Sequence, residues 1–172
     1  TAPIVNGVQS GGESSVGGEV QINSIGVEET WARLKQNADS VLIDVRTIAE
    51  LAYVGLPDLS SIGKQPVLVE WQSFPGDRLN AEFVDRVAEA LSAIGAQKNS
   101  ELLFICRSGV RSLKAARAMA AAGYSRCWNV ADGFEGPLDA DRHRGRLQGW
   151  KAKGFRGHKG SVHMQRMRIE AA

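Results

Sequence analysis

The chemistry of this chain centres on Cys106, which ends an apolar run and begins a short loop of small residues. The run, residues 102–105, has no alternating polar positions, which is typical of a strand buried on both faces of a parallel sheet. Residues 112–122 are rich in strong helix formers. We therefore predict Cys106 at the carboxyl end of a strand, beside a helix N-terminus and between Arg107 and Arg111. This position favours the thiolate form of the sulfur.

The loop after the cysteine supplies groups that can bind a substrate. Gly109 allows the backbone to curl, so that several N–H groups point inward and form a nest for an anion. Such a nest can hold an oxyanion or the terminal sulfur of a persulfide. We expect Cys106 to be the nucleophile and the loop to bind substrate through Arg107, Ser108, Gly109, Val110 and Arg111.

This loop resembles the active-site loop of the rhodanese family of sulfurtransferases. Cysteine-dependent phosphatases that share the rhodanese fold place an arginine six residues after the cysteine, where it binds phosphate bidentately. This chain has Ser112 at that place, and its arginine comes one residue earlier, at Arg111. The shorter loop is a smaller bowl that suits a sulfane sulfur better than a phosphate. A phosphatase or an arsenate reductase of the same fold is therefore the weaker interpretation.

Two further stretches carry the resemblance. Asp44-Val45-Arg46 follows an apolar run, as at the end of the second rhodanese strand, and Gly133-Phe134 follows the strand predicted at residues 127–130. From the residues alone, Asp44 is most simply a turn-forming carboxylate, and Arg46 is equally a surface side chain or a cation near Cys106. The resemblance places Arg46 at the substrate rim and leaves Asp44 as structural support, a role we also give to Ser112.

The chain departs from the family pattern at two places. Asp132 replaces the first of two glycines that rhodaneses have before the aromatic residue, and residues 53–61 lack the histidine that many rhodaneses carry there. Cys127 is a candidate resolving thiol, although a lone cysteine in a strand is more often simply buried.

The resemblance implies a double displacement. Cys106 takes a sulfane sulfur from a small anionic donor such as thiosulfate and passes it to cyanide or a thiol, while Arg107, Arg111 and Arg46 orient the donor. The alternative from another class is a rhodanese-like module that binds a partner, or carries sulfur to it, without useful turnover.

Strands alternate with helices along the chain, which predicts a doubly wound α/β domain with a parallel sheet. The resemblance covers about residues 20–150 and implies five strands. We expect a flexible leader at residues 1–18, one domain at 19–150 and a basic tail at 151–172. The predicted strands are residues 20–22, 41–46, 67–71, 102–105 and 127–130, and the predicted helices are residues 28–38, 47–52, 80–93 and 112–122.

Charge is unevenly distributed, although the net charge is only +2. Residues 1–141 contain 12 Lys and Arg against 18 Asp and Glu, whereas residues 142–172 contain 9 against 1. This basic arm is either solvated or contacts an acidic protein partner. Nucleic acid is a less favoured partner, because no nucleic-acid motif accompanies the charge.

Composition narrows the remaining classes of protein, namely membrane proteins and metalloproteins. No apolar run approaches the roughly 20 residues that cross a bilayer, so we expect a cytoplasmic protein without membrane contact, although a processed leader remains open. The two cysteines and three histidines lack metal-ligand spacing, and we expect neither a metal nor another cofactor.

Overall fold

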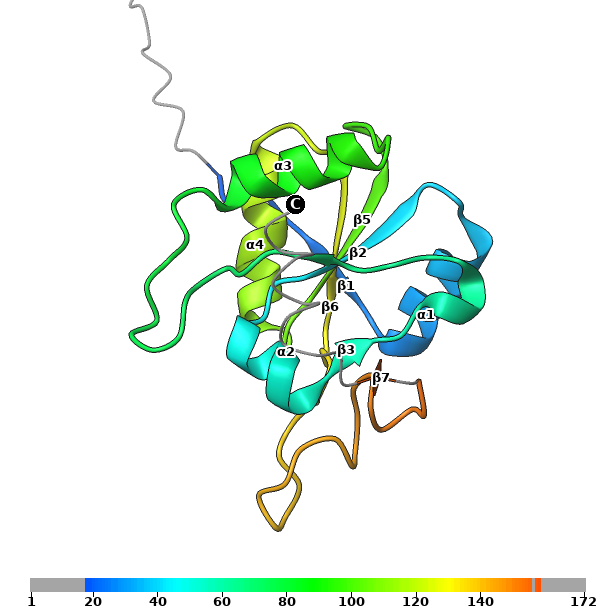
Figure 1. Ribbon diagram of the computed structural model, residues 1–172, viewed down its shortest axis with the longest axis vertical. Coiled ribbons are helices and arrows are strands. Elements are labelled where there is room, and N and C mark those ends of the chain that lie inside the picture. Colours follow the sequence, from blue (N-terminus) through cyan, green and yellow to red (C-terminus); the bar gives the residue numbers. More distant parts are fainter. Residues whose placement is uncertain (1–17, 156, 159–172) are drawn as a thin grey trace, which may run out of the picture.

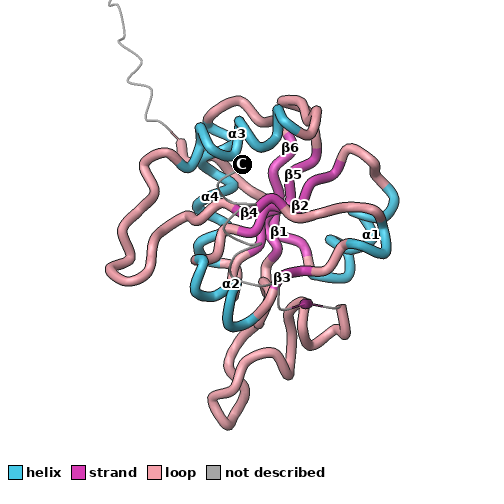
Figure 2. The backbone as a smooth tube through the Cα atoms, in the orientation of Figure 1, coloured by secondary structure: helices cyan, strands magenta, loops and turns pink. Residues whose placement is uncertain are grey.

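The computed structural model describes residues 18–155 and 157–158 (Figures 1 and 2). Its helices are α1 (Val27–Gln36), α2 (Ile48–Val54), α3 (Phe83–Ala93) and α4 (Val110–Ala121), with a short 3-10 helix at Ser60–Ile62. Its strands are β1 (Asn23–Ile25), β2 (Ser40–Asp44), β3 (Leu56–Pro57), β4 (Val67–Leu68), β5 (Glu101–Ile105), β6 (Arg126–Val130) and β7 (Gly157–His158).

Five strands form one parallel sheet in the order β1-β6-β5-β2-β4, which confirms the predicted fold class. The strands β5 and β2 are buried along their whole length, as their apolar runs predict. In their register Asp44 lies opposite Ile105. The two strands therefore end side by side at the carboxyl edge of the sheet. This edge brings the segment after Asp44 next to Cys106.

Helices cover both faces of the sheet. On one face α3 and α4 pack against alternate residues of the central strands, among them Ile43 and Phe104. On the other face α1 and the segment after β6 pack against the intervening residues, among them Leu42 and Leu103. The short helix α2 begins with a capping box, in which the side chains of Thr47 and Glu50 each accept a hydrogen bond from the other residue's backbone N–H.

The edge strands differ most from the predicted bounds. The first strand is Asn23–Ile25 rather than residues 20–22, and only Ile25 of its three residues is buried. The regular ladder of β4 ends at Leu68, although the N–H groups of Val69 and Trp71 still donate to the carbonyls of Asp44 and Val45. The expected third strand, residues 67–71, therefore runs beside β2 and the residue after it, but its regular ladder ends at its second residue.

The described structure continues past the expected domain boundary at residue 150. Trp150 is fully buried and packs edge-on against Trp31, and Phe155 stacks on Trp31 with ring centroids 5.1 Å apart. The short strand β7 then pairs antiparallel with β3. The expected leader, apart from Gly18, and the rest of the basic tail lie outside the described residues. In the described part of the chain, no helix is long and apolar enough to cross a membrane.

Candidate active site

Cys106 directly follows β5, at the carboxyl edge of the sheet and before the first turn of α4. Its side chain is only 1% exposed and belongs to the core on the α3 and α4 face. The turn after β6 is held against its backbone, because the N–H of Phe134 donates to the carbonyl of Cys106. Because Cys106 is buried, a reacting atom has to enter the loop to meet the sulfur.

Two groups that can donate hydrogen bonds lie within reach of the sulfur atom. The N–H of Gly109 and the hydroxyl of Ser112 each lie 3.2 Å from Sγ. Gly109 is the N-cap of α4 and has a φ of 98°, a conformation that favours glycine. A Cβ at this position would overlap the carbonyl oxygen of Ala131, so both the backbone angle and the space require glycine.

Asn129 and Ser24, which the sequence did not single out, extend the contacts of Ser112. The hydroxyl of Ser112 also lies 2.6 Å from Oδ1 of Asn129, whose Nδ2 donates to the hydroxyl of Ser24 at 3.1 Å. Ser112 and Asn129 are buried, whereas Ser24 is exposed on the edge strand β1. The signal that could have identified this network is the Asn in the buried half of β6, because buried amides need hydrogen-bond partners.

Arg111 points to α2, where Glu50 binds it. The guanidinium donates to both carboxylate oxygens of Glu50, at 2.6 and 2.8 Å. Burial alone would raise the pKa of Glu50, but the hydrogen bonds and charge of Arg111, together with Thr47, lower it to about 2. Hydrogen bonding to Glu50 likewise raises the pKa of Arg111. The charge of Arg111 is thus matched by a carboxylate that sequence analysis did not identify.

Arg46 lies inside the protein rather than on the expected substrate rim. Its side chain and that of Asp44 are both 0% exposed, and Nη2 of Arg46 lies 2.7 Å from the Asp44 carboxylate. Nη2 also donates to the carbonyl of Gly55, and the guanidinium stacks 4.0 Å from the ring centre of Phe134. Burial and pairing make both residues structural here. The spacing of Asp44 and Arg46 in the sequence was a signal for this pairing, because residues two apart in an extended chain share a face.

A cavity of about 610 Å³ opens beside the loop, between α2 and the segment after β4. Arg107, Arg111 and Glu50 line it together with two aromatic side chains, Tyr53 and Phe74. These aromatics are 82% and 67% exposed. Arg107 is exposed, and among the described residues its guanidinium has no carboxylate partner. It is therefore the cation best placed to meet an anion that enters this cavity. In the rest of the loop Ser108 is half-buried and the side chain of Val110 is exposed.

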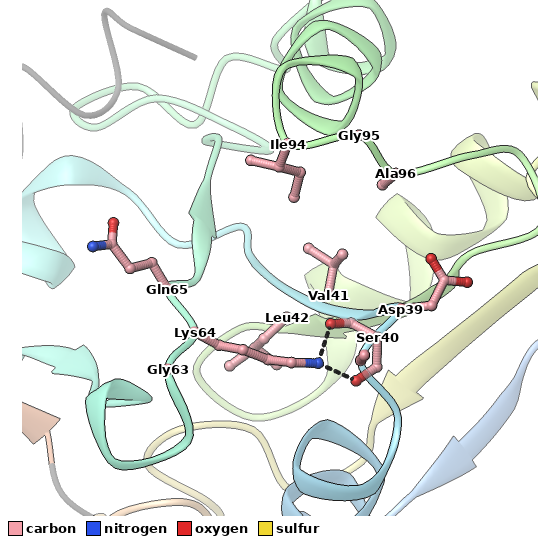
Figure 3. Close-up of a pocket in the computed structure, with 11 residues that line it drawn as sticks. Asp39, Ser40, Val41, Leu42, Gly63, Lys64, Gln65, Ile94, Gly95 and Ala96 are labelled. Carbon is pink, nitrogen blue, oxygen red and sulfur yellow. Dashed lines mark hydrogen bonds between the residues drawn. The ribbon is translucent and has the colours of Figure 1, made fainter.

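A second cavity, of about 720 Å³, lies where β2 begins, away from Cys106 (Figure 3). Lys64 extends along its wall, and its Nζ donates to the carbonyls of Asn37 and Ser40 and to the Ser40 hydroxyl, each at 2.7 Å. Burial lowers the pKa of Lys64. Its three N–H groups already have acceptors, and Asp39 accepts from the hydroxyl of Ser100. Lys64, Ser40 and Asp39 in this cavity are thus used by the fold.

Cys127 does not meet Cys106. It lies opposite Leu102 in the β5–β6 register, four residues before Cys106 along β5, which is about 13 Å of strand. A disulfide requires Cα atoms roughly 4.4–6.8 Å apart. Burial also raises the pKa of Cys127 to about 12. The two cysteines are therefore separate groups, and Cys127 is a half-buried thiol of β6.

One cluster among the described residues has metal-ligand side chains, Asp139, Asp141 and His143. Oδ1 of Asp139 accepts the backbone N–H groups of Asp141 and His143, and Oδ2 lies 3.5 Å from Arg146. These contacts are those of a closed turn, and two of its three members are exposed.

Comparisons with known proteins agree on one group of relatives. A family model described as the STR4 middle domain matches residues 22–151. An uncharacterized protein of Rickettsia rickettsii is 35% identical over 117 residues, which are 68% of this chain and 87% of that protein. A protein named sulfurtransferase from Allochromatium vinosum is 27% identical over 113 residues, 66% of this chain and 85% of that protein. The crystal structure of Rv0390 from M. tuberculosis has a TM-score of 0.70 at 38% identity, covering 82% of this chain and 100% of that one.

Proposed function

Since this chain belongs to the rhodanese family of single-domain sulfurtransferases, we propose that it transfers a sulfane sulfur through a persulfide on Cys106. The sulfur donor is a small anion such as thiosulfate, and the acceptor is cyanide or a thiol. The observation that carries this proposal is the placement of the Cys106 sulfur, inside a six-residue loop and in contact with two hydrogen-bond donors.

The reaction is a double displacement. The Cys106 thiolate attacks the outer sulfur of thiosulfate, the sulfur–sulfur bond of the donor breaks, and sulfite leaves with the bonding electron pair. Cyanide then attacks the terminal sulfur of the persulfide, which yields thiocyanate and returns the electron pair to the Cys106 thiolate. Neither step needs an oxidant or a reductant, and no proton has to be transferred once the sulfur is ionised.

The residues around the sulfur have distinct tasks in this reaction. Gly109 and Ser112 donate hydrogen bonds to the negative sulfur, and Arg107 attracts the anionic donor at the cavity. Glu50 holds Arg111 beside the loop and matches its charge.

The same geometry disfavours the phosphatase alternative. A phosphatase loop needs an arginine that is free to bind phosphate bidentately. Here both carboxylate oxygens of Glu50 already occupy the guanidinium of Arg111. The buried sulfur also suits a donor whose attacked atom is terminal, because a phosphorus atom surrounded by oxygens has to bring those oxygens into the loop.

Intact mass tests the proposal. Three proteins are compared: wild type, Cys106→Ser and the control Cys127→Ser. Each is incubated with thiosulfate and desalted, and its intact mass is measured. Cyanide is then added, and the thiocyanate formed is measured. We expect a gain of one sulfur atom on wild type and Cys127→Ser only, removed by cyanide with an equal yield of thiocyanate. Absence of the gain from wild type, or its persistence in Cys106→Ser, contradicts the proposal and favours a binding module.

A further inference from the structure

The hydroxyl of Ser112 has one hydrogen atom but two acceptors within reach. Oδ1 of Asn129 lies 2.6 Å from it, and the Cys106 sulfur lies 3.2 Å from it. A hydroxyl donates one hydrogen bond and accepts up to two, so it cannot donate to both groups at once. Which acceptor receives the hydrogen depends on the state of the sulfur.

The network has two complete arrangements. When Cys106 is a thiol, its S–H donates to the Ser112 oxygen, Ser112 donates to Oδ1 of Asn129, and Nδ2 of Asn129 donates to Ser24. When Cys106 is a thiolate, its proton has left to water and Ser112 donates to the sulfur. Asn129 then satisfies the Ser112 oxygen only if its amide turns over, with Nδ2 donating to Ser112 and Oδ1 accepting from the Ser24 hydroxyl.

We propose that Asn129 is a positioning residue whose amide reverses when Cys106 ionises, and so releases the Ser112 hydrogen for the thiolate. An amide suits this task because its two ends are nearly equal in size, one accepting and the other donating. Ser24 completes both arrangements, since a hydroxyl can donate or accept. This inference rests on the proposed function, because it explains how the nucleophile of that reaction is held as a thiolate.

The effect is separable from the charges near the sulfur. Arg111 interacts electrostatically with Cys106, but Glu50 binds it, and the Asp44–Arg46 pair of the neighbouring strand is internally matched. Arg107, Lys114, Asp132 and Glu135 are further charged groups near the loop. Arg117 of α4 pairs with Glu19, and Arg126 of β6 pairs with Glu101 of β5. The variants proposed below change none of these side chains.

The pH dependence of Cys106 alkylation by iodoacetamide, followed by peptide mass, tests the proposal without requiring sulfur transfer. The variants are Asn129→Leu, Asn129→Asp and Ser112→Ala, together with the two double variants. Ser125→Ala is the matched control, because this exposed serine, just before β6, lies outside the network. A failure of persulfide formation leaves this measurement intact, so the two proposals can fail independently.

We expect Ser112→Ala to raise the pH midpoint of alkylation by about one unit, because the thiolate loses one hydrogen bond. Asn129→Asp also raises it, since a carboxylate only accepts and retains the Ser112 hydrogen. Asn129→Leu does not raise it, because the Ser112 hydrogen is then free for the sulfur. In the Ser112→Ala background, Asn129→Asp raises the pH midpoint less than it does in wild type, and Asn129→Leu does not change it.

Two results would overturn the proposal. One is a midpoint that rises in Asn129→Leu as it does in Ser112→Ala, which would make Asn129 a general support of the loop. The other is an Asn129→Asp shift of equal size with and without the Ser112 hydroxyl, which would show a charge acting through space. If Asn129→Asp does not fold, the comparison of Ser112→Ala with Asn129→Leu still tests the proposal, because only Ser112→Ala is expected to raise the pH midpoint.

Discussion

The buried pair of Asp44 and Arg46 allows a sharp test of structure against catalysis at this site. In Arg46→Met the side chain remains similar in size, but the Asp44 carboxylate loses its Nε and Nη2 donors in a position with 0% exposure. Breaking a buried ion pair by removing one partner costs about 3–5 kcal/mol. The carbonyl of Gly55 loses a donor as well. We expect the free energy of unfolding to fall by about that amount.

The double variant Asp44→Asn/Arg46→Met measures the pair itself. It removes both charges and keeps Oδ1 as an acceptor for the backbone N–H of residue 46. We expect it to recover most of the lost stability, because replacing both partners of a buried pair is often nearly neutral. Urea unfolding followed by tryptophan fluorescence gives these free energies.

Turnover of thiosulfate distinguishes the buried role from a place on the substrate rim. In the folded Arg46→Met protein we expect the KM for thiosulfate to change less than about twofold, since the guanidinium faces Asp44 and Phe134. Arg107→Met is the contrasting control, because its exposed side chain lines the cavity: it should raise KM and leave stability unchanged. A tenfold rise in KM for Arg46→Met without a loss of stability would refute this reasoning.

Two further predictions concern Glu50 and Cys127. The pKa of Glu50 is about 2 against an ordinary 4.5, so its ionised form stabilises the fold above pH 4.5, and this contribution is lost as the pH falls toward 2. Glu50→Gln should therefore lower the free energy of unfolding by about 1–2 kcal/mol at pH 7, allowing for solvent screening, and urea unfolding at pH 7 and pH 3.5 should show this difference shrinking. Cys127→Ser should keep the persulfide yield, and oxidised wild type should show no intramolecular disulfide; a mass loss of two hydrogens in oxidised wild type would contradict the separation of the two thiols.

The sequence predicted the central elements well because their signals are local. Residues 41–43 and 102–105 are apolar without interruption, and a strand buried on both faces needs that composition. The edge strand β1 was placed three residues too early, because Val20 and Ile22 looked more strand-like than Asn23 and Ser24. The strand lies where it pairs with β6, and pairing with a distant strand overrides local preference.

Within the site, contacts between distant residues were beyond prediction. Glu50 and Arg111 are 61 positions apart, and Ser24 and Asn129 are 105 apart. Each pair forms because the sheet order brings its elements together, with β1 beside β6 and β5 beside β2. The motif identified the cysteine, its loop and Ser112, but not the partners that decide which of these groups remain free.

Those partners change how the thiolate has to be stabilised. The sequence suggested a sulfur among free cations, but the structure matches Arg111 with Glu50 and Arg46 with Asp44. With these two cations paired, a thiolate at Cys106 would rely more on hydrogen-bond donors and on the dipole of a helix N-terminus. In this loop the donors are the N–H of Gly109 and the hydroxyl of Ser112, at the start of α4. The direction of a single hydroxyl hydrogen, which Asn129 controls in our proposal, therefore carries more weight at this site than the arginines of the motif.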